Sequence, residues 1–374
     1  MLITYDNKKH EKTILEKTSR AELKTISGNG AKNKLIQADN LSTLKTLFDN
    51  YSSKIDLIYI DPPFATNGHF KISDGRANTI SSSNDDAIAY SDILVGADFF
   101  EFLRERLIFL RELLSERGSI YLHIDYKIGH YVKLIMDEVF GREMFRNDIT
   151  RIKCNPKNFP RKAYGNIKDL ILFYSKSESP TWNDPHVPFS EEDKNRLFKK
   201  IDKDGRRYTT IPLHAPGETS NGNTGKKWKE LMPPKGRHWR SDPVILEELD
   251  KQGLIEWSAN GVPRKKIFLD EKEGKKMQDI WKFKDPQYPQ YPQYPTEKSL
   301  DLLKFIIEAS SNEDDLVLDC FCGSGTTLIA AQLLNRNWIG VDKSEPAIKV
   351  TQKRLNDLPS SLFSKVEYEF LKEA

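Results

Sequence analysis

The stretch Leu316-Val317-Leu318-Asp319-Cys320-Phe321-Cys322-Gly323-Ser324-Gly325 joins an apolar run to a glycine-rich turn. A helical pattern follows over Thr326 to about Asn335, and a second apolar run, Trp338 to Asp342, comes after it. Strand, glycine-rich turn, helix and strand form the repeating unit of a parallel sheet covered by helices. Ligands of such sheets bind outside the carboxyl ends of the strands, so this turn is expected to face a ligand.

The same turn has the features of a site for a nucleoside-containing cofactor. Gly323 and Gly325 let a ligand approach the backbone, and Asp342 ends the next strand, where an acidic residue typically holds ribose hydroxyls. The third glycine of the dinucleotide fingerprint is absent, which disfavours a nicotinamide dehydrogenase. A cofactor without a pyrophosphate, such as S-adenosylmethionine, does not need that glycine. A lone Gly-x-Gly is equally compatible with an ordinary tight turn.

A second unusual turn, Asp61-Pro62-Pro63-Phe64, follows the apolar run Ile55 to Ile60. Prolines supply no N–H and fix φ, and the residue before a proline is held extended. The Asp61 carboxylate and the Pro62 carbonyl therefore point in set directions, and the corner is suited to grip a planar amino group. A plain strand-ending turn is the alternative interpretation.

Apolar periodicity predicts the surrounding elements. Further strands are expected at 35–39, 119–124, 148–152 and 169–174, and helices at 41–48, 129–139, 299–309 and from Leu103 to a stop at Gly118. Residues 65–97 have no sustained period and are expected to form a long loop beside the Asp61 corner. Pro-Gln-Tyr repeats over 286–295 predict an extended tether.

Together, the two turns resemble the motifs of the beta group of amino-directed DNA methyltransferases, which includes the modification subunits of type III restriction systems. In that family a catalytic Asp-Pro-Pro-Tyr/Phe motif precedes a Phe-x-Gly-x-Gly cofactor motif, and the same order occurs here, within a match over most of residues 34–350. The resemblance implies an α/β fold with a doubly wound mixed sheet. This is the Rossmann-like fold of methyltransferases that use S-adenosylmethionine, with a permuted motif order and an inserted target-recognition domain.

The resemblance also implies a function. The expected activity is site-specific transfer of a methyl group from S-adenosylmethionine to the N6 amine of a flipped adenine, in a restriction-modification or orphan modification system. An N4-cytosine methyltransferase is the runner-up, because Asp rather than Ser before the prolines favours adenine only by family analogy. A catalytically idle DNA-recognition subunit is the alternative from another class, and the intact motifs argue against it.

Site residues are assigned by the same resemblance. Asp61 and the Pro62 carbonyl would accept the two protons of the amine while Phe64 stacks on the base, so the catalytic set is Asp61, Pro62, Pro63 and Phe64. The cofactor set is Asp39, Thr296, Lys298, Asp319, Phe321, Gly323, Ser324, Gly325 and Asp342. Within it, Asp39 would lie near the adenine, and Thr296 and Lys298 near the carboxylate. His123 resembles a residue that lines the base pocket, but a buried histidine without a catalytic role is at least as consistent.

The expected domains are an N-terminal extension (1–33), a catalytic half (34–180), a target-recognition insertion (181–285), and a linker with the cofactor-binding half (286–374). The net charge of the chain is only +3, yet Lys194 to Arg240 holds 13 basic and 4 acidic residues. This stretch predicts contact with a polyanion, although a solvated basic surface is the alternative. The expected DNA-binding residues are Arg206, Arg207, Lys226, Lys227, Arg237, His238 and Arg240.

Composition sets the remaining expectations. The 374 residues lack an apolar run long enough for a membrane helix and an apolar signal core at the N-terminus, so a cytoplasmic protein without a membrane partner is expected. Cys154, Cys320 and Cys322 fit neither a disulfide framework nor a metal cluster, so reduced thiols and no metal site are predicted. Double-stranded DNA is the expected partner, and the resemblance adds a homodimer and a separate restriction subunit.

Overall fold

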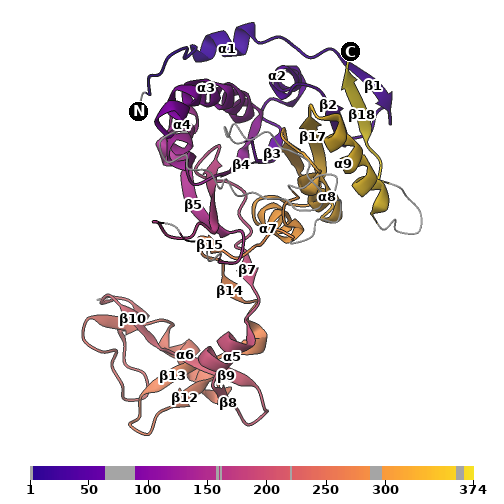
Figure 1. Ribbon diagram of the computed structural model, residues 1–374. Helices are drawn as coiled ribbons and strands as arrows, with labels where there is room; N and C mark the ends of the chain where they lie inside the picture. Colours follow the sequence, from indigo (N-terminus) through magenta and orange to yellow (C-terminus); the bar gives the residue numbers. More distant parts are fainter. Residues whose placement is uncertain are drawn as a thin grey trace. The chain divides into compact units, whose positions relative to one another are not determined.

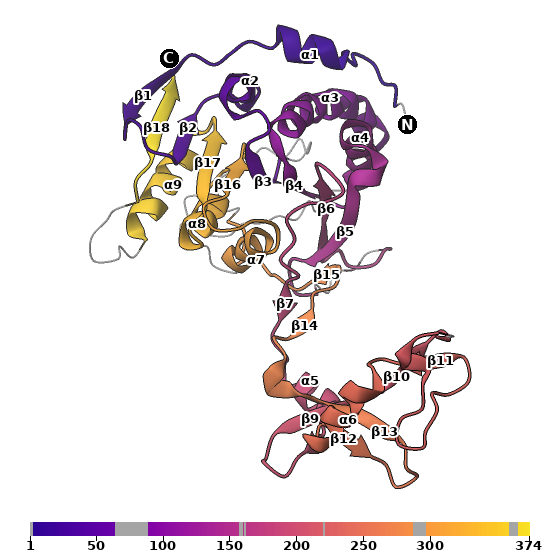
Figure 2. The same ribbon diagram turned by 180° about the vertical axis from the view of Figure 1, so that it is seen from behind.

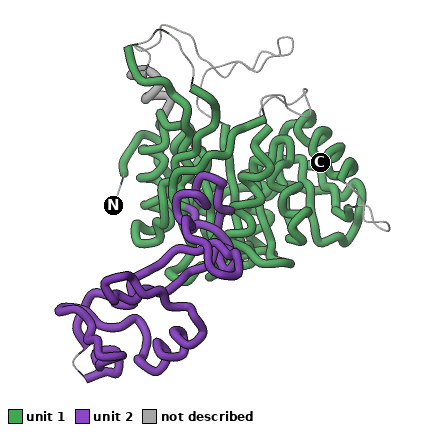
Figure 3. Tube along the Cα trace, turned by 90° about the horizontal axis from the view of Figure 1, so that it is seen from below, with its two compact units in different colours: residues 1–185, 278–374 green, residues 186–277 purple. Residues whose placement is uncertain are grey.

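The computed structural model describes residues 3–63, 89–156, 160, 162–219, 221–286, 297–358 and 366–374, with side chains in the second range from residue 97 onward. Phe64, Thr296 and nearly all of the Pro-Gln-Tyr repeat lie outside the described residues. The chain divides into two compact units (Figure 3), unit 1 with residues 1–185 and 278–374 and unit 2 with residues 186–277. Unit 2 falls inside the stretch 181–285 that was expected to be an insertion.

In unit 1, ten described strands form one sheet in the order β1-β18-β2-β17-β16-β3-β4-β6-β5-β15 (Figure 1). Their bounds are β1 (Leu23–Ser27), β2 (Lys34–Gln37), β3 (Ile55–Ile60), β4 (Leu114–Ile124), β5 (Phe145–Ile152), β6 (Lys168–Ser175), β15 (Ile280–Trp281), β16 (Leu316–Asp319), β17 (Asn337–Asp342) and β18 (Glu369–Glu373). Neighbours from β18 to β4 are parallel, whereas β6 is antiparallel to β4 and to β5. The predicted doubly wound mixed sheet is therefore confirmed.

Helices cover both faces of this sheet (Figures 1 and 2). One group comprises α1 (Glu11–Lys17), α2 (Asn40–Tyr51), α3 (Ala89–Leu113) and α4 (Gly129–Phe140). The other comprises α7 (Leu300–Ser310), α8 (Thr326–Leu333) and α9 (Glu345–Asp357). Side-chain oxygens start several helices, since Asp39 caps α2 and Ser344 caps α9.

The two halves of the chain add their strands toward opposite edges of the sheet. From β3 the chain continues through α3 to β4 on one side, whereas from β16 it continues through α8 to β17 on the other. Because β3 and β16 are adjacent, the strand order switches between them. Ligands of doubly wound sheets bind in the crevice at such a switch point.

Two predictions about the segment after Asp61 are wrong. Helix α3 begins at Ala89, so the last part of the expected loop 65–97 is helical, and the part before residue 89 lies outside the described residues. The helix also ends at Leu113 rather than at Gly118. Strand β4 begins directly after the helix, where Leu114 pairs with Ile55. The next pair is Leu57 with Ser119, so the residues between Leu114 and Ser119 form an irregularity in the strand, which the helical period of the sequence masks.

Unit 2 contains short elements that the apolar pattern did not predict. They are β7 (His186–Val187), α5 (Glu191–Leu197), β8 (Lys200–Ile201), β9 (Arg207–Pro212), β10 (His214–Pro216), β11 (Arg237–Trp239), α6 (Pro243–Lys251), β12 (Ile255–Trp257), β13 (Pro263–Phe268) and β14 (Lys275–Lys276). An antiparallel sheet has the order β12-β13-β9-β8, and β10 pairs with β11. A small core forms around Trp228, Trp239 and Leu246. Most of these strands have only two or three residues, too few for a visible period.

None of the described helices is long and apolar enough to pass through a membrane. The three cysteines are free thiols, with Cys320 and Cys322 buried beside the glycine-rich turn. Burial raises the pKa of both thiols, so neither has the thiolate character of a nucleophile.

Candidate active site

The Asp61 corner and the glycine-rich turn follow neighbouring parallel strands. Val317 of β16 pairs with Leu57 of β3, and Leu318 pairs with Ile58. Both strands therefore end at the same edge of the sheet, where β3 leads into Asp61 and β16 ends in Asp319. The two motifs, some 260 residues apart in sequence, begin side by side at the switch point.

The two oxygens of the Asp61 carboxylate have different surroundings. Oδ2 lies 2.8 Å from the Lys298 ammonium. Oδ1 is buried and has no hydrogen-bond partner among the residues that the structure describes, and His123 Nδ1 lies 4.0 Å away from it. A buried acceptor without a donor is costly, so Oδ1 is a candidate to receive a hydrogen bond from a ligand.

His123 is fully buried at the end of β4 and has a partner for each ring nitrogen. Nδ1 lies 2.8 Å from the Tyr59 hydroxyl, and Nε2 lies 3.3 Å from the Asp169 carboxylate. Burial and the nearby Lys298 charge lower the pKa of His123, against the opposing effect of Asp169. The ring is thus a neutral, fixed wall of the corner. The hydrogen-bonded histidine that the sequence allowed is present.

Behind His123 lie charged residues that the two sequence motifs do not indicate. Lys153 donates to Asp169 at 2.6 Å. Burial would raise the pKa of Asp169, but His123 and Lys153 outweigh this effect and hold that pKa well below the usual range. The fully buried Arg151 pairs with Asp285 and donates to the Phe283 carbonyl. Charged residues inside otherwise apolar strands were the available signal, since such residues are rarely buried without partners.

The glycine-rich turn has the backbone conformation that requires glycine. Gly323 and Gly325 have φ of 50° and 75°, in the left-handed region. A Cβ on Gly325 would also come within 2.6 Å of Thr351 on α9. The Thr351 hydroxyl donates to the Gly323 carbonyl at 2.9 Å, so α9 packs directly under the turn.

A buried arginine, Arg354, is hydrogen-bonded to Ser324. Arg354 Nη1 donates to the Ser324 carbonyl at 2.9 Å, to the Ser324 hydroxyl at 3.1 Å and to the Thr326 hydroxyl at 2.9 Å. Its Nη2 lies 3.0 Å from Glu297, and both side chains are less than 10% exposed. The Ser324 hydroxyl is thus engaged inside the protein, and the missed Arg354 fixes the turn.

Two carboxylates border the turn. Asp319 accepts hydrogen bonds from the Thr327 hydroxyl at 2.6 Å and the Phe321 amide at 3.0 Å. Burial is the main cause that raises the pKa of Asp319 to about 7, with Asp61 and Asp342 adding to it against those hydrogen bonds. Asp342 accepts from the Gly323 amide at 2.9 Å and the Ser344 amide at 2.8 Å, and burial raises its pKa.

The raised pKa of Asp319 makes stability depend on pH. A carboxylate whose pKa rises from 3.8 unfolded to about 7 folded costs nothing below the unfolded pKa and costs most above pH 7. Asp319→Asn removes this cost. Without cofactor, the difference in unfolding free energy between the variant and wild type should therefore shift in favour of the variant by about 2 to 3 kcal/mol from pH 5 to pH 8. Denaturant titrations at both pH values measure the difference. A difference that does not change with pH would contradict the assignment.

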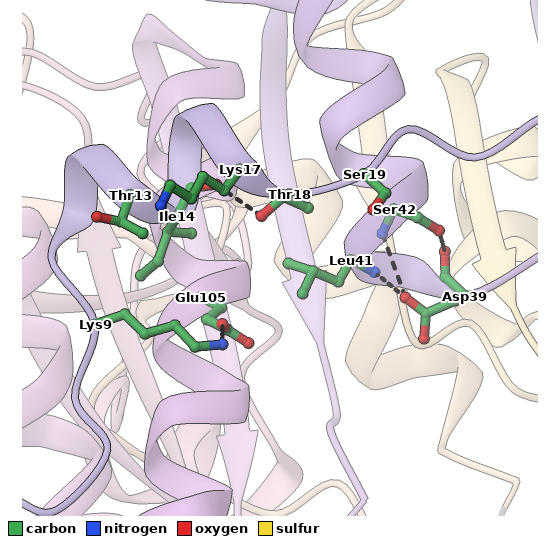
Figure 4. Close-up of a pocket in the computed structure, with 10 residues that line it drawn as sticks. All are labelled: Lys9, Thr13, Ile14, Lys17, Thr18, Ser19, Asp39, Leu41, Ser42 and Glu105. Atoms are coloured by element: carbon green, nitrogen blue, oxygen red, sulfur yellow. Dashed lines mark hydrogen bonds and ion pairs between the residues drawn. The ribbon is translucent and has the colours of Figure 1, made fainter.

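Asp39 lies apart from these groups as the cap of α2. Its Oδ1 accepts from the Leu41 and Ser42 amides, and its Oδ2 is 3.9 Å from Arg106. It also lines a pocket of about 440 Å³ (Figure 4), together with Lys9, Thr13, Ile14, Lys17, Thr18, Ser19, Leu41, Ser42 and Glu105. The next residue, Asn40, donates to the Cys320 carbonyl at 2.9 Å, so the start of α2 touches the end of β16. Phe321 contacts Phe102 of α3, with ring centroids 6.2 Å apart.

Comparison with known proteins identifies the family. Residues 55–353 match the DNA methylase family of N6/N4 methyltransferases. The chain belongs to the N6/N4 DNA methylase family. It is a DNA methyltransferase, and the methyl donor of its family is S-adenosylmethionine. The resemblance seen in the two motifs is confirmed.

The chain is similar to several individual proteins. The Type II methyltransferase M.EcaI of Enterobacter cloacae is 40% identical over 94% of this chain and 77% of its own length. The StyLTI Mod subunit of the type III restriction-modification enzyme of Salmonella typhimurium is 27% identical over 87% of this chain, which spans only 54% of that relative. The crystal structure of the M1.HpyAVI–SAM complex is 20% identical, covers 86% of this chain and 98% of its own, and has a TM-score of 0.45.

In unit 2 of the methyltransferase, the seven expected DNA-binding residues separate into two groups. Some are held by internal contacts. Arg206 pairs with Asp270 and Glu271 at 2.8 and 2.7 Å, Arg207 donates to Asn195 and Lys227 pairs with Glu230. The other group lies on or next to the β10–β11 hairpin, where Lys226, Arg237 and Arg240 are exposed and His238 bonds the Gly217 carbonyl.

Proposed function

We propose that this chain methylates the N6 amine of adenine at specific DNA sites. The observation that carries the proposal is Asp61 Oδ1, a buried acceptor at the switch point without a hydrogen-bond partner among the described residues. The amine of a base that has left the duplex would supply the missing donor. Such extrusion is required because a stacked, paired base cannot enter a pocket of this kind.

The corner would activate the amine through hydrogen bonds. An aromatic amine is a poor nucleophile because its lone pair is delocalised into the ring. Asp61 Oδ1 and the Pro62 carbonyl, accepting one proton each, would favour the tetrahedral amine that develops in the transition state. Pro63 would keep the corner rigid and Phe64 would stack on the base, offsetting part of the few kcal/mol that unstacking costs. S-adenosylmethionine supplies the activated methyl group when bound.

The residues at this edge fit that cofactor chemically. Its sulfonium and ammonium groups are cations, and the Asp319 carboxylate is a buried anion whose raised pKa a nearby cation would lower. Asp342 would hold the ribose hydroxyls, Gly323 and Gly325 would allow close approach, and Phe321, Ser324 and Asp39 would border the site. Thr296 would lie near the carboxylate of the cofactor.

Unit 2 would be the target-recognition domain, with the hairpin group as its phosphate-binding residues. Lys226→Ala and Arg240→Ala should each weaken DNA binding and reduce the slope of log K against log salt by about 1. Arg206→Ala is the matched control, since its guanidinium is already paired with Asp270 and Glu271. Fluorescence anisotropy over a salt series measures the slopes. An equal change of slope in Arg206→Ala would contradict this division.

We further propose that the enzyme serves a restriction-modification or orphan modification system in the cytoplasm, with double-stranded DNA as substrate. A homodimer and a separate restriction subunit are proposed as partners on the likeness to Mod subunits. Because the chain spans about half the length of those subunits, the partner activity is a proposal of its own. Size-exclusion chromatography with light scattering tests the dimer.

Sequencing DNA from a host that expresses the chain, with detection of modified bases, tests the proposed substrate. N6-methyladenine in one recurring sequence context is the expected result. N4-methylcytosine in such a context would establish the runner-up. Unmodified DNA, together with specific binding by the purified protein, would instead support a recognition subunit without catalysis.

A further inference from the structure

Lys298 has a defined partner in the structure. Its ammonium lies 2.8 Å from Asp61 Oδ2, with both side chains largely withdrawn from solvent at 18% and 23% exposure. Burial would lower the pKa of Lys298, but the charges of Asp61 and Asp285 outweigh it and raise that pKa. The ammonium is therefore a charged group directed at the catalytic corner.

The residues on either side of Lys298 hold it in place. Glu297 pairs with Arg354, which binds the glycine-rich turn. The amide of Ser299 donates to Asp285 at 3.2 Å, and the Ser299 side chain caps α7. The lysine thus lies between two anchored neighbours, which fix the backbone from which its side chain reaches Asp61.

Pairing on one side decides what the other side of the carboxylate can do. A carboxylate that is free to rotate can turn either oxygen toward a ligand, and either oxygen can accept a hydrogen bond from the same donor. With Oδ2 bound to Lys298, Oδ1 is directed away from the ammonium and stays without a partner among the described residues. The charge of Lys298 also balances that of Asp61 in a site that already contains the carboxylates of Asp169, Asp285 and Asp319.

We infer that Lys298 is a positioning residue for Asp61, holding Oδ2 so that Oδ1 is left as the acceptor for the amine of the target base. This role rests on the proposed function. It differs from a contact with the cofactor carboxylate, which the sequence resemblance implied for Lys298. The two roles make opposite predictions for kinetics and cofactor binding.

Lys298→Met and Lys298→Arg separate these roles, with Lys349→Met as the matched control. Lys349 forms an ion pair of similar length, 2.7 Å, with Glu345 on the exposed side of α9. Methyl transfer is measured in single turnovers with saturating tritiated S-adenosylmethionine on unmethylated DNA of random sequence. Binding of S-adenosylhomocysteine is measured by calorimetry, and folding by the melting temperature.

The positioning role predicts that Lys298→Met lowers the saturated rate about 30-fold or more, the size of a lost transition-state contact, while the Kd for S-adenosylhomocysteine changes by less than about threefold. Lys298→Arg keeps the charge and should recover most of the rate, and Lys349→Met should match wild type. If Lys298→Met does not fold, the same rate and Kd are measured for Lys298→Gln, with the same expected results.

Other results overturn the inference. A Kd that rises more than about tenfold with the saturated rate retained would make Lys298 a cofactor contact. A rate in Lys298→Arg as low as that of a folded Lys298→Met would show that the cation does not position Asp61. Absence of transfer by the wild-type protein would instead count against the proposed function itself.

Discussion

Asp61→Asn should lower the single-turnover rate of methyl transfer by at least about 10³-fold, the upper range for removal of one preorganised group that stabilises a transition state. The substitution keeps the size of the side chain but removes its negative charge and one of its two acceptor oxygens. The developing positive charge on the amine would then have no buried counter-charge at Oδ1. Methyl transfer from tritiated S-adenosylmethionine to unmethylated DNA measures the rate.

Binding measurements show whether that loss belongs to catalysis. Asp61→Asn should bind S-adenosylhomocysteine and DNA within a few-fold of wild type, because the glycine-rich turn and unit 2 are unchanged. Asp56→Asn is a matched control on the same strand, since Asp56 binds Ser115 and the Leu316 amide at the opposite end of β3. A variant at Asp61 that retained a tenth of the rate would exclude Asp61 as the acceptor.

Arg354→Met should lower the free energy of unfolding by about 3 to 5 kcal/mol, because it leaves the buried Glu297 carboxylate without its counter-charge. It also removes three hydrogen bonds to Ser324 and Thr326, so the glycine-rich turn should loosen. Denaturant titration measures the stability, and calorimetry should show weaker binding of S-adenosylhomocysteine.

An exposed arginine provides the comparison for Arg354. Arg20 pairs with Asp49 at 2.7 Å with 60% of its side chain exposed, so Arg20→Met should lower the free energy of unfolding far less than Arg354→Met does. Adding Glu297→Gln to Arg354→Met should restore part of the stability, since it removes the buried charge that Arg354 no longer balances. Equal losses from Arg354→Met and Arg20→Met would refute the view that Arg354 anchors the turn.

The sequence predicted the centre of the fold because that centre is encoded locally. Strands 55–60 and 316–319 have the predicted bounds, since each is a short apolar run closed by a distinctive turn. The carboxyl ends of parallel strands share an edge, so the meeting of the two turns followed from the strand, helix, strand rhythm.

Features that depend on distant partners were not predictable from local pattern. Lys298 lies next to Asp61, and Arg354 next to Ser324, only because α7 and α9 pack where they do. Likewise, no local property separates Arg206, which is held by Asp270 and Glu271, from the exposed Arg240. The start of α3 at Ala89 was missed because the expected loop was extended from the polar residues before it over Ile93, Leu94 and Ala97, which have helical spacing.

A crystal structure with S-adenosylhomocysteine bound tests most directly whether the two motifs form one site. The sulfur is expected to lie at the carboxyl ends of β3 and β16, facing Asp61 across the glycine-rich turn. Binding of the ligand away from that edge, for example wholly within the pocket lined by Lys9, Lys17 and Glu105, would contradict it.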